Sequence, residues 1–285
     1  MIGANRFMLM FLLVSPTGLS AQQADVTFFV IGKHASFEQE ETGGLQPVDF
    51  SFFSEIFLSA NGDASDAVLT LPTGARFKYR DLRGVEGGER DNLLLVSGKR
   101  RYPSFAELQH DYPDGQYTIS FETPGGRVNN ASLVFTGNAL PEAPRILPRQ
   151  AGKPVCSVVD PSLPLTVYWS PFVAGTSDSQ GILDDLVFVI LTDDEGHRVA
   201  HSGRPFEGQP YLTYQARSFE IPVGTMEAGR AYRLTVEHAI LDDTRFVSDI
   251  PAMTTRAVTT GISFKTAAND VDAADCHPAN RGEVD

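Results

Sequence analysis

Short runs rich in apolar residues recur along most of the chain, and clusters of Gly, Pro and Asp separate them. The run 186–192 is nearly all apolar, and in many of the others apolar and polar residues alternate. Because side chains point alternately to the two faces of a strand, such a run predicts a half-buried β-strand. The runs are rich in Val, Phe, Thr and Tyr, which also favours strands. They lie at residues 26–31, 50–58, 67–71, 75–79, 92–96, 117–121, 131–136, 165–169, 186–192, 197–201, 218–223, 231–237 and 258–265.

One segment carries a helical signal instead. Ser104 stands three residues before Glu107, which is the capping-box pattern of a helix N-terminus. Pro113 and Gly115 end this element after about two turns. Many short strands with one short helix predict an all-β protein built from antiparallel β-sandwiches.

Residues 141–154 differ in composition from both flanks, because four prolines fall close together there. A proline-rich segment favours an extended, semi-rigid connector. We therefore expect an N-terminal β-sandwich domain over 22–140, a Pro-rich linker over 141–154 and a second sandwich domain over 155–268. The polar residues 269–285 would then form a C-terminal tail.

Each half contains a turn glycine that is closely followed by a tyrosine at the start of a strand. Tyr117 follows Gly115 in the first half, and Tyr232 follows Gly229 in the second. The repetition favours two tandem sandwiches and makes Tyr117 a candidate core residue.

Two phrases of the second half carry a family resemblance. Trp169 lies in LTVYWSP, and Tyr232 lies in MEAGRAYRLTV. Through them, residues 143–267 resemble a fibronectin type III domain. The resemblance implies an immunoglobulin-like sandwich in which Trp169 is a core residue and Tyr232 ties down a neighbouring corner. It does not imply cell adhesion, because the expected late loop has no Arg-Gly-Asp.

The first half is similar to the β-rich N-terminal regions of uncharacterised secreted bacterial proteins. The phrases that carry this likeness are LPTG at 71–74 and YPDGQY at 112–117. The likeness is diffuse and implies no activity.

The N-terminus predicts export. Arg6 precedes the apolar run FMLMFLLV, and the small residues Ser20 and Ala21 follow, as in a secretory signal peptide over 1–21. Eight apolar residues span only about 12 Å as a helix, against about 30 Å for the hydrocarbon core of a bilayer. We therefore expect a secreted protein, periplasmic or extracellular, that has no membrane anchor.

The chain has two cysteines, Cys156 and Cys276. In an oxidising compartment we expect them to form a disulfide, with two free thiols as the alternative. Closing a loop of this length would stabilise the fold by about 4–5 kcal/mol in the chain-entropy model.

The charge balance narrows the choice of partners. The chain has 36 Asp and Glu against 23 Lys and Arg, a formal net charge of −13. Such an acidic surface repels phosphate backbones and anionic lipids, so we expect neither nucleic-acid nor membrane binding.

The sequence lacks the common catalytic motifs. It contains no Gly-x-Ser-x-Gly, no phosphate-binding Gly-rich loop with Lys-Ser/Thr, no His-Glu-x-x-His and no Cys-x-x-Cys. His197 and His201 lie about 13 Å apart along a predicted strand, too far to share one metal ion. We therefore expect no catalytic residue, metal or cofactor.

Acidic residues cluster in several turns, at 184–185, 193–195, 242–243 and 270–275. None of the clusters matches a known calcium-binding loop, so solvated turns are expected and a structural calcium ion stays an alternative.

Exposed aromatic residues are the best candidates for ligand contact. Alternation places Phe53 and Phe57 on the polar face of their strand, where they could form a ligand platform or pack against the other domain or the short helix. Phe206, Tyr211 and Tyr214 lie in a Gly/Pro-rich segment and could contact a ligand or fold onto their own loop. These five residues are the predicted ligand-contact set.

Two functions follow as hypotheses. The first is a secreted, non-catalytic binding or structural module that recognises an unidentified protein or glycan. The alternative is a secreted hydrolase that acts on glycans with carboxylates in an interdomain cleft. A pocket that holds converging carboxylates with raised pKa values would favour the alternative.

Overall fold

The computed structural model describes residues 25–83, 93–137, 139–155 and 157–268. Within them the chain forms 18 strands in three sheets and one helix, so the expected all-β class with a single short helix is confirmed. No helix in these ranges is long and apolar enough to cross a bilayer. The expected signal peptide (1–21), the polar tail (269–285), Cys156 and Cys276 lie outside the described residues.

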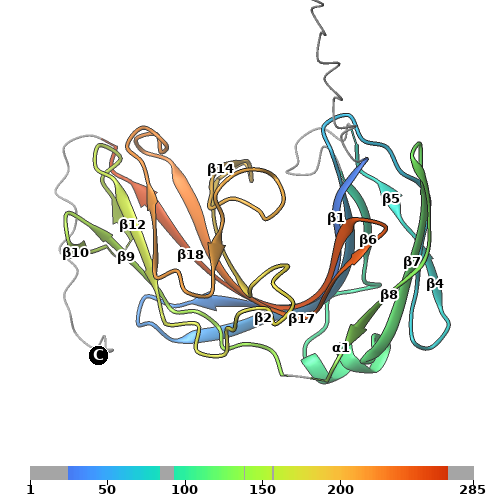
Figure 1. Ribbon diagram of the computed structural model, residues 1–285. Helices are drawn as coiled ribbons and strands as arrows, with labels where there is room; N and C mark the ends of the chain where they lie inside the picture. Colours follow the sequence, from blue (N-terminus) through green and yellow to red (C-terminus); the bar gives the residue numbers. More distant parts are fainter. Residues whose placement is uncertain (1–24, 84–92, 138, 156, 269–285) are drawn as a thin grey trace, which may run out of the picture.

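The largest sheet, called here the central sheet, contains ten strands from both halves of the chain (Figure 1). Eight strands follow the order β14-β13-β17-β18-β1-β2-β6-β5, while β11 pairs with β18 and β15 pairs with β13. The strands are β1 (Val26–Gln39), β2 (Leu45–Leu58), β5 (Arg80–Asp81), β6 (Leu93–Ser97), β11 (Val158–Val159), β13 (Leu186–Asp193), β14 (Arg198–His201), β15 (Leu212–Thr213), β17 (Ala231–Val247) and β18 (Ile250–Thr266).

Two four-stranded sheets pack against the central sheet, one in each half. The N-terminal outer sheet has the order β4-β3-β7-β8 and the C-terminal outer sheet the order β10-β9-β12-β16. Their strands are β3 (Ser65–Thr70), β4 (Arg76–Lys78), β7 (Gly115–Thr123), β8 (Gly126–Phe135), β9 (Ile146–Gln150), β10 (Lys153–Pro154), β12 (Leu165–Trp169) and β16 (Ser218–Ile221).

The helix α1 (Phe105–Asp111) lies between β6 and β7 in the chain. The Ser104 side chain accepts a hydrogen bond from the Glu107 backbone N–H at 3.3 Å, as the capping box predicts. Leu108 is the buried residue of this helix and anchors it to the N-terminal core.

A long hairpin of β17 and β18 joins the two halves. Its turn residues Ser248 and Asp249 both have positive φ, 49° and 64°, which is the geometry of a two-residue type I′ turn. Val247 and Ile250 beside the turn pack on the N-terminal core, whereas Phe264 near the other end belongs to the C-terminal core. Strand β1 runs parallel to β18 and pairs with it over ten positions, which fixes the N-terminal half to the same hairpin.

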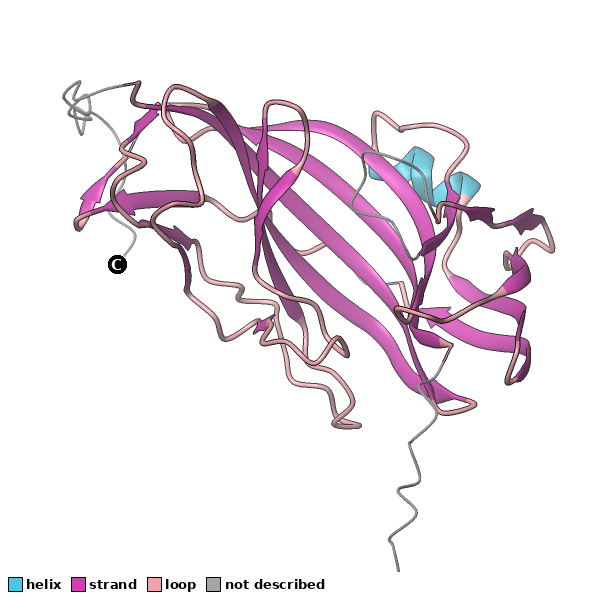
Figure 2. Cartoon of the chain, turned by 90° about the horizontal axis from the view of Figure 1, so that it is seen from above, coloured by secondary structure: helices cyan, strands magenta, loops and turns pink. Residues whose placement is uncertain are grey.

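Both cores lie on the same face of the central sheet. Ala252 belongs to the N-terminal core and Phe264 to the C-terminal core, and an even number of residues separates them along one strand. The central sheet is bent, and the outer sheets lie on the outside of the bend (Figures 1 and 2). The face that carries both cores is therefore called the convex face, and the opposite one the concave face.

This architecture corrects two expectations. The regions 22–140 and 155–268 do not form separate tandem sandwiches, because their strands share the central sheet. The segment 141–154 is also not a plain linker, since it contains β9 and β10. Ile146 is fully buried there, and the Gln39 side chain bonds to both its backbone N–H and its carbonyl, at 2.7 and 2.8 Å. Burial of the residues between the prolines draws the segment into a sheet.

The three expected core residues are all buried. Tyr117 lies in the N-terminal core, and Trp169 and Tyr232 lie in the C-terminal core. The Tyr117 hydroxyl donates to the Pro113 carbonyl at 2.7 Å, and the Tyr232 hydroxyl accepts from the Glu227 backbone N–H at the same distance. The repeated Gly-to-Tyr phrase thus places a tyrosine against the preceding corner in each half, as in a tyrosine corner.

A buried ionic cluster lies on the convex face between the two cores. Arg256 on β18 and Lys33 on β1 are register partners, and both side chains are fully buried. Both bind Asp114 Oδ1, at 2.9 and 2.6 Å, and Arg256 also binds the fully buried Asp242 at 2.6 Å. The Lys33 ammonium also donates to Gln109 of α1. Burial lowers the pKa of Lys33 to about 8, although Asp114 opposes the shift.

Candidate functional site

The concave face of the central sheet has a hollow in its middle, called here the trough. Neighbouring strands place small side chains side by side there. Ala239 on β17 pairs with Ala257 on β18, and Gly32 on β1 pairs with Thr255 on β18. Of these four residues, Ala239 and Thr255 line the hollow, whereas the Phe53 ring lies over Gly32.

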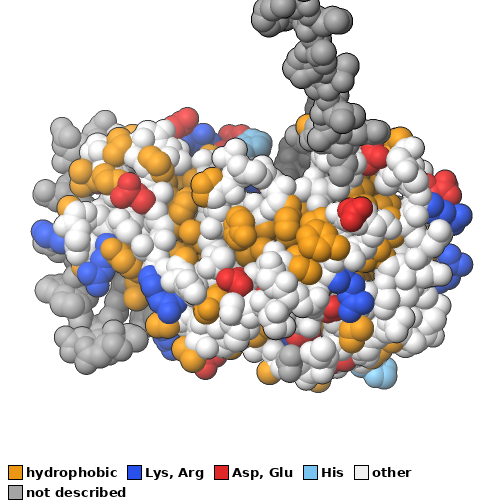
Figure 3. Space-filling model, viewed as in Figure 1, with side chains coloured by type: hydrophobic (Ala, Val, Ile, Leu, Met, Phe, Trp, Pro, Cys, Tyr) orange, Lys and Arg blue, Asp and Glu red, His pale blue; other side chains and the backbone are white. Residues whose placement is uncertain are grey.

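Aromatic side chains surround the trough and form a third hydrophobic cluster on this face. The rings of Phe28 and Phe57 stack at 4.2 Å, and the Phe206 ring lies 5.9 Å from that of Phe28. Phe53 on β2 and Phe188 on β13 belong to the same cluster. Figure 3 shows hydrophobic side chains gathered across the middle of the molecule, between its two ends.

Phe53 holds its place because its register partner is a glycine. A Cβ atom on Gly32 would lie 2.1 Å from the tip of the Phe53 ring, so any other residue there would force the ring to move. An aromatic ring that covers a cross-strand glycine is a recurrent device in sheets. Here it sets the position of the ring that borders the trough.

Two cavities meet at Phe53. The first, about 210 Å³, is mainly apolar and is lined by Phe28, Phe53 and Phe188 among others, with Glu55 and Glu237 as its carboxylates. The second, about 540 Å³, is more polar. It shares Phe53 and Glu237 with the first and adds the side chains of His34, Ser36, Ser51, Ser97, Arg100 and Arg101.

Glu237 is the polar centre of the trough. Its carboxylate Oε2 accepts a hydrogen bond from Thr259 Oγ1 at 2.8 Å and lies 3.6 Å from His34 Nε2. The side chain is 26% exposed, opening into the cavities. Burial among apolar neighbours raises the pKa of Glu237 to about 7, and the hydrogen bond from Thr259 opposes this only in part.

His34 and Thr259 form a chain of hydrogen bonds that ends at Glu237. Its Nε2 lies 2.7 Å from Thr259 Oγ1. Because the Thr259 hydroxyl donates its proton to Glu237, it must accept from His34, which assigns the imidazole proton to Nε2. Burial lowers the pKa of His34 to about 4, so the ring is neutral at physiological pH.

The segment after β14 extends over the concave face as far as β1 and β2, where Phe206 meets Phe28 and Arg204 meets Phe57. The Arg204 guanidinium lies 5.4 Å from the centre of the Phe57 ring and 3.6 Å from the Glu207 carboxylate. Burial lowers the pKa of His201 to about 4, helped by nearby arginine charge. Phe206 has a positive φ of 65°, which is strained for a residue with a large side chain and indicates that its position is imposed by the surrounding structure.

Of the five predicted ligand-contact residues, Phe53 lines both cavities of the trough, whereas Phe57 and Phe206 pack beside it in the same cluster without lining either cavity. Phe53 and Phe57 come from β2 and Phe206 from a distant loop. Tyr211 is 39% exposed in that loop, outside the cavity lining. Tyr214 instead packs on the C-terminal core beside Gly175.

Sequence reasoning missed Phe28, Phe188, His34 and Glu237. A glycine inside a strand pattern, Gly32, was a usable signal, since such a residue often marks a close approach of other groups. Glu237 offered none, because only the folding of distant strands around it raises its pKa.

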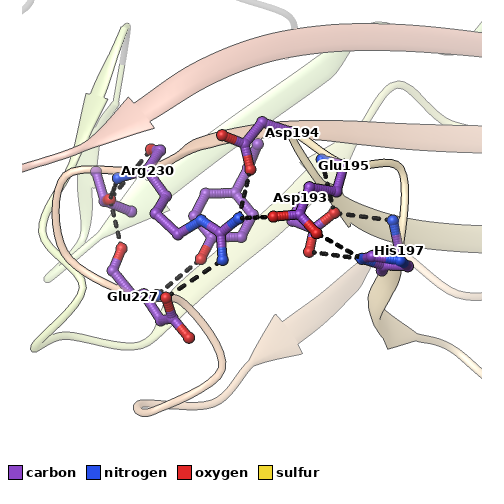
Figure 4. A network of polar contacts seen from close by, with 8 residues as sticks. Asp193, Asp194, Glu195, His197, Glu227 and Arg230 are labelled. Atoms are coloured by element: carbon purple, nitrogen blue, oxygen red, sulfur yellow. Dashed lines mark hydrogen bonds and ion pairs between the residues drawn. The ribbon is translucent and has the colours of Figure 1, made fainter.

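The acidic cluster 193–195 is held by Arg230 and by backbone N–H groups of its own turn (Figure 4). Arg230 binds Asp194 at 2.7 Å and Glu195 at 3.1 Å. The Asp193 carboxylate accepts hydrogen bonds from the backbone N–H groups of Glu195 and His197, which closes the turn. These contacts account for the acids as turn and ion-pair residues.

The other histidine and acidic residues singled out in the sequence are placed as follows. His197 is exposed beside this turn, whereas His201 lines the trough. Asp185 accepts hydrogen bonds from the backbone N–H groups of Thr176 and Leu241, at 2.8 and 2.7 Å, and so fixes its loop. In the described part of the chain no three His, Cys, Asp or Glu side chains gather as a metal site.

Comparison with known proteins identifies no family. No protein-family model and no curated protein matches the chain. Among solved structures, the adhesin InvE of Yersinia pseudotuberculosis aligns with 81% of this chain at 11% sequence identity. The aligned part spans 58% of that structure, and the TM-score is 0.18, which is too low to support an argument about fold or function.

Proposed function

We propose that this chain is a secreted, non-catalytic binding module that holds a protein or glycan ligand in the trough. The single observation that carries the proposal is the convergence of Phe28, Phe53 and Phe188 around a cavity whose floor includes Ala239 and Thr255. A concave, mainly apolar site with a few placed polar groups is the usual form of a ligand pocket.

Arrays of glycans and of peptides, probed with the labelled protein, test this proposal. Phe53→Ala and Ala239→Leu should each lower the signal about tenfold or more, because one removes a ring from the cavity lining and the other adds bulk to the cavity floor. Tyr168→Ala, which removes an exposed ring on β12 outside the trough, is the matched control and should keep the signal. Wild-type binding that both trough variants retain would contradict the proposal, as would no binding to either array.

A specific observation favours a second candidate, a hydrolase that acts on glycans. Glu237 has a pKa of about 7, suited to a general acid, and Glu55 lines the same cavity. In that case the protein should cleave chromogenic oligosaccharides, and Glu237→Gln should abolish the cleavage. Cleavage that survives Glu237→Gln would remove Glu237 as the acid.

The proposal includes export and a disulfide between Cys156 and Cys276. Intact-mass analysis of the secreted protein should show loss of the segment 1–21 and a gain of about 2 Da on reduction. An unchanged mass on reduction would mean two free thiols.

We also propose that the C-terminal sandwich follows the fibronectin type III pattern in its core. The burial of Trp169 and the corner contact of Tyr232 support this. The sharing of the central sheet with the N-terminal half is a departure from an independent domain of that family.

A further inference from the structure

Resting on the proposed function, we infer that the ligand of the trough carries a quaternary ammonium group, which lies among Phe28, Phe53 and Phe188 beside the Glu237 carboxylate. The inference names the chemical class that the cavity recognises, whichever larger molecule carries the group.

The rings supply the first part of the argument. Phe28, Phe53 and Phe188 all line the cavity of about 210 Å³. The face of an aromatic ring attracts a cation through its quadrupole, and the attraction grows when the site excludes water. An apolar cavity bordered by several rings is therefore suited to a cation that is itself apolar on its surface.

The lining also selects between kinds of cation. A primary ammonium group has three N–H donors that each need an acceptor. Most of the side chains around this cavity are apolar and offer none, and its side-chain acceptors are limited to Glu55, His201, Glu237 and Thr255. A quaternary ammonium group has no N–H, so it can enter without leaving a donor unpaired.

Glu237 supplies the counter-charge. In the described ranges of the chain, no Lys or Arg forms an ion pair with Glu237, whose contacts are the Thr259 hydroxyl and the neutral His34 ring. A buried carboxylate in this situation is destabilised as an anion and takes up a proton near neutral pH. A bound cation would stabilise the ionised form of Glu237, so binding should release a proton from this carboxyl group.

Several charged or titratable groups face Glu237 from the elements packed around it. They are His34 on β1, Glu55 on β2, His201 on β14, Arg204 after β14, and Arg100 and Arg101 across the second cavity. Arg204 is engaged by Glu207 and by the Phe57 ring, and Arg100 and Arg101 pair with Glu107 and Asp49. His34 and His201 both have a pKa of about 4, so neither changes charge between pH 6 and 8.

Choline and its neutral isostere 3,3-dimethyl-1-butanol test the inference by titration calorimetry on the full chain, with butylammonium as a third probe. Choline should bind more tightly than the other two. Its apparent affinity should rise about tenfold from pH 6 to pH 8, because the ionised fraction of Glu237 rises from about one tenth to about nine tenths. Glu237→Gln should remove this pH dependence and most of the affinity.

Matched variants separate the cavity from general effects. Glu220→Gln, on the exposed face of β16, should leave choline binding unchanged. Phe188→Leu keeps apolar volume but removes a ring, and should weaken choline more than the neutral alcohol. Thermal melts of each variant identify any that fail to fold, and Phe188→Leu then carries the test in place of Glu237→Gln.

The outcomes separate this inference from the proposed function. Equal binding of choline and the alcohol, or pH-independent choline binding, would overturn the cation inference. The proposed binding function would still be supported if the array experiment gave its expected result. Absence of binding by all three probes would overturn it as well. Choline binding with the predicted pH dependence supports it, whatever macromolecule the arrays identify.

Discussion

The two faces of the central sheet are made by the same strands but differ in what fills them. On β18, Ala252, Arg256 and Phe264 point to the convex face, where they meet two apolar cores and the ionic cluster between them. The intervening residues Thr255 and Ala257 point to the concave face, where Ala257 is buried in the third hydrophobic cluster and Thr255 lines the apolar cavity. Alternation along one strand thus places two cores and the ionic cluster on one face, and a smaller cluster with the apolar cavity on the other.

The largest effect should come from the ionic cluster on the convex face. Arg256→Ala should destabilise the fold by about 3–5 kcal/mol, because it removes the buried guanidinium that pairs with the fully buried Asp242. Urea denaturation measures the loss. The double variant Arg256→Met/Asp242→Leu, which leaves no unpaired charge from this pair, should recover most of it. A loss below about 1 kcal/mol for Arg256→Ala would mean that water or another group compensates Asp242.

Truncation of one phenylalanine on each face compares the faces directly. Phe29 on β1 is fully buried in the N-terminal core, and Phe29→Ala should destabilise by about 3–5 kcal/mol. Phe53→Ala should destabilise by only about 1 kcal/mol, because this ring is partly exposed on the concave face. Urea denaturation of both variants checks the difference. Equal losses would show that the concave face is as much a part of the core as the convex one.

The local sequence pattern predicts which side of a strand each residue faces, but it does not predict which residues meet on the concave face. The alternation that places Phe52 and Phe53 on opposite sides of β2 is visible in the sequence, as are the helix cap and the two tyrosine corners. Which residues would meet across the concave face was not visible, because β1 and β18 pair although more than 200 positions separate them. No local pattern encodes a parallel pairing over that distance.

The segment 141–154 illustrates the same limit. Its prolines indicate an extended chain, and the chain is extended, but Ile146 and Gln150 are buried because the C-terminal outer sheet forms around them. The composition of this segment predicts its extended backbone, but tertiary packing decides whether it is a linker between domains or part of a sheet.

The pH dependence of stability isolates Glu237. A carboxyl group with a folded pKa of about 7 and an unfolded value near 4.5 binds more protons in the folded state between these pH values. Its contribution to stability is therefore lost as the pH rises through this window. Glu237→Gln removes the dependence, so relative to the wild type the variant should gain about 2–3 kcal/mol between pH 5 and pH 8.

Urea denaturation at several pH values measures this difference. The histidines with a lowered pKa, His34, His201 and His238, titrate in both proteins, and comparison at each pH largely removes their contribution. Glu220→Gln is the control and should show a constant difference from the wild type. A constant difference for Glu237→Gln would mean that the trough does not hold this carboxyl in its protonated form.

The smallest effect, and the sharpest test of how the concave face is built, is the coupling between Gly32 and Phe53. Gly32→Ala should destabilise the fold and displace the ring, because the new Cβ would lie 2.1 Å from the ring tip. Once Phe53→Ala has removed the ring, the added methyl group meets no such obstacle. The stability loss of the double variant should then be smaller than the sum of the two single losses by at least about 0.5 kcal/mol. Additive losses in the urea-denaturation cycle would show that the ring is not held over the glycine, and that the border of the trough is set by other contacts.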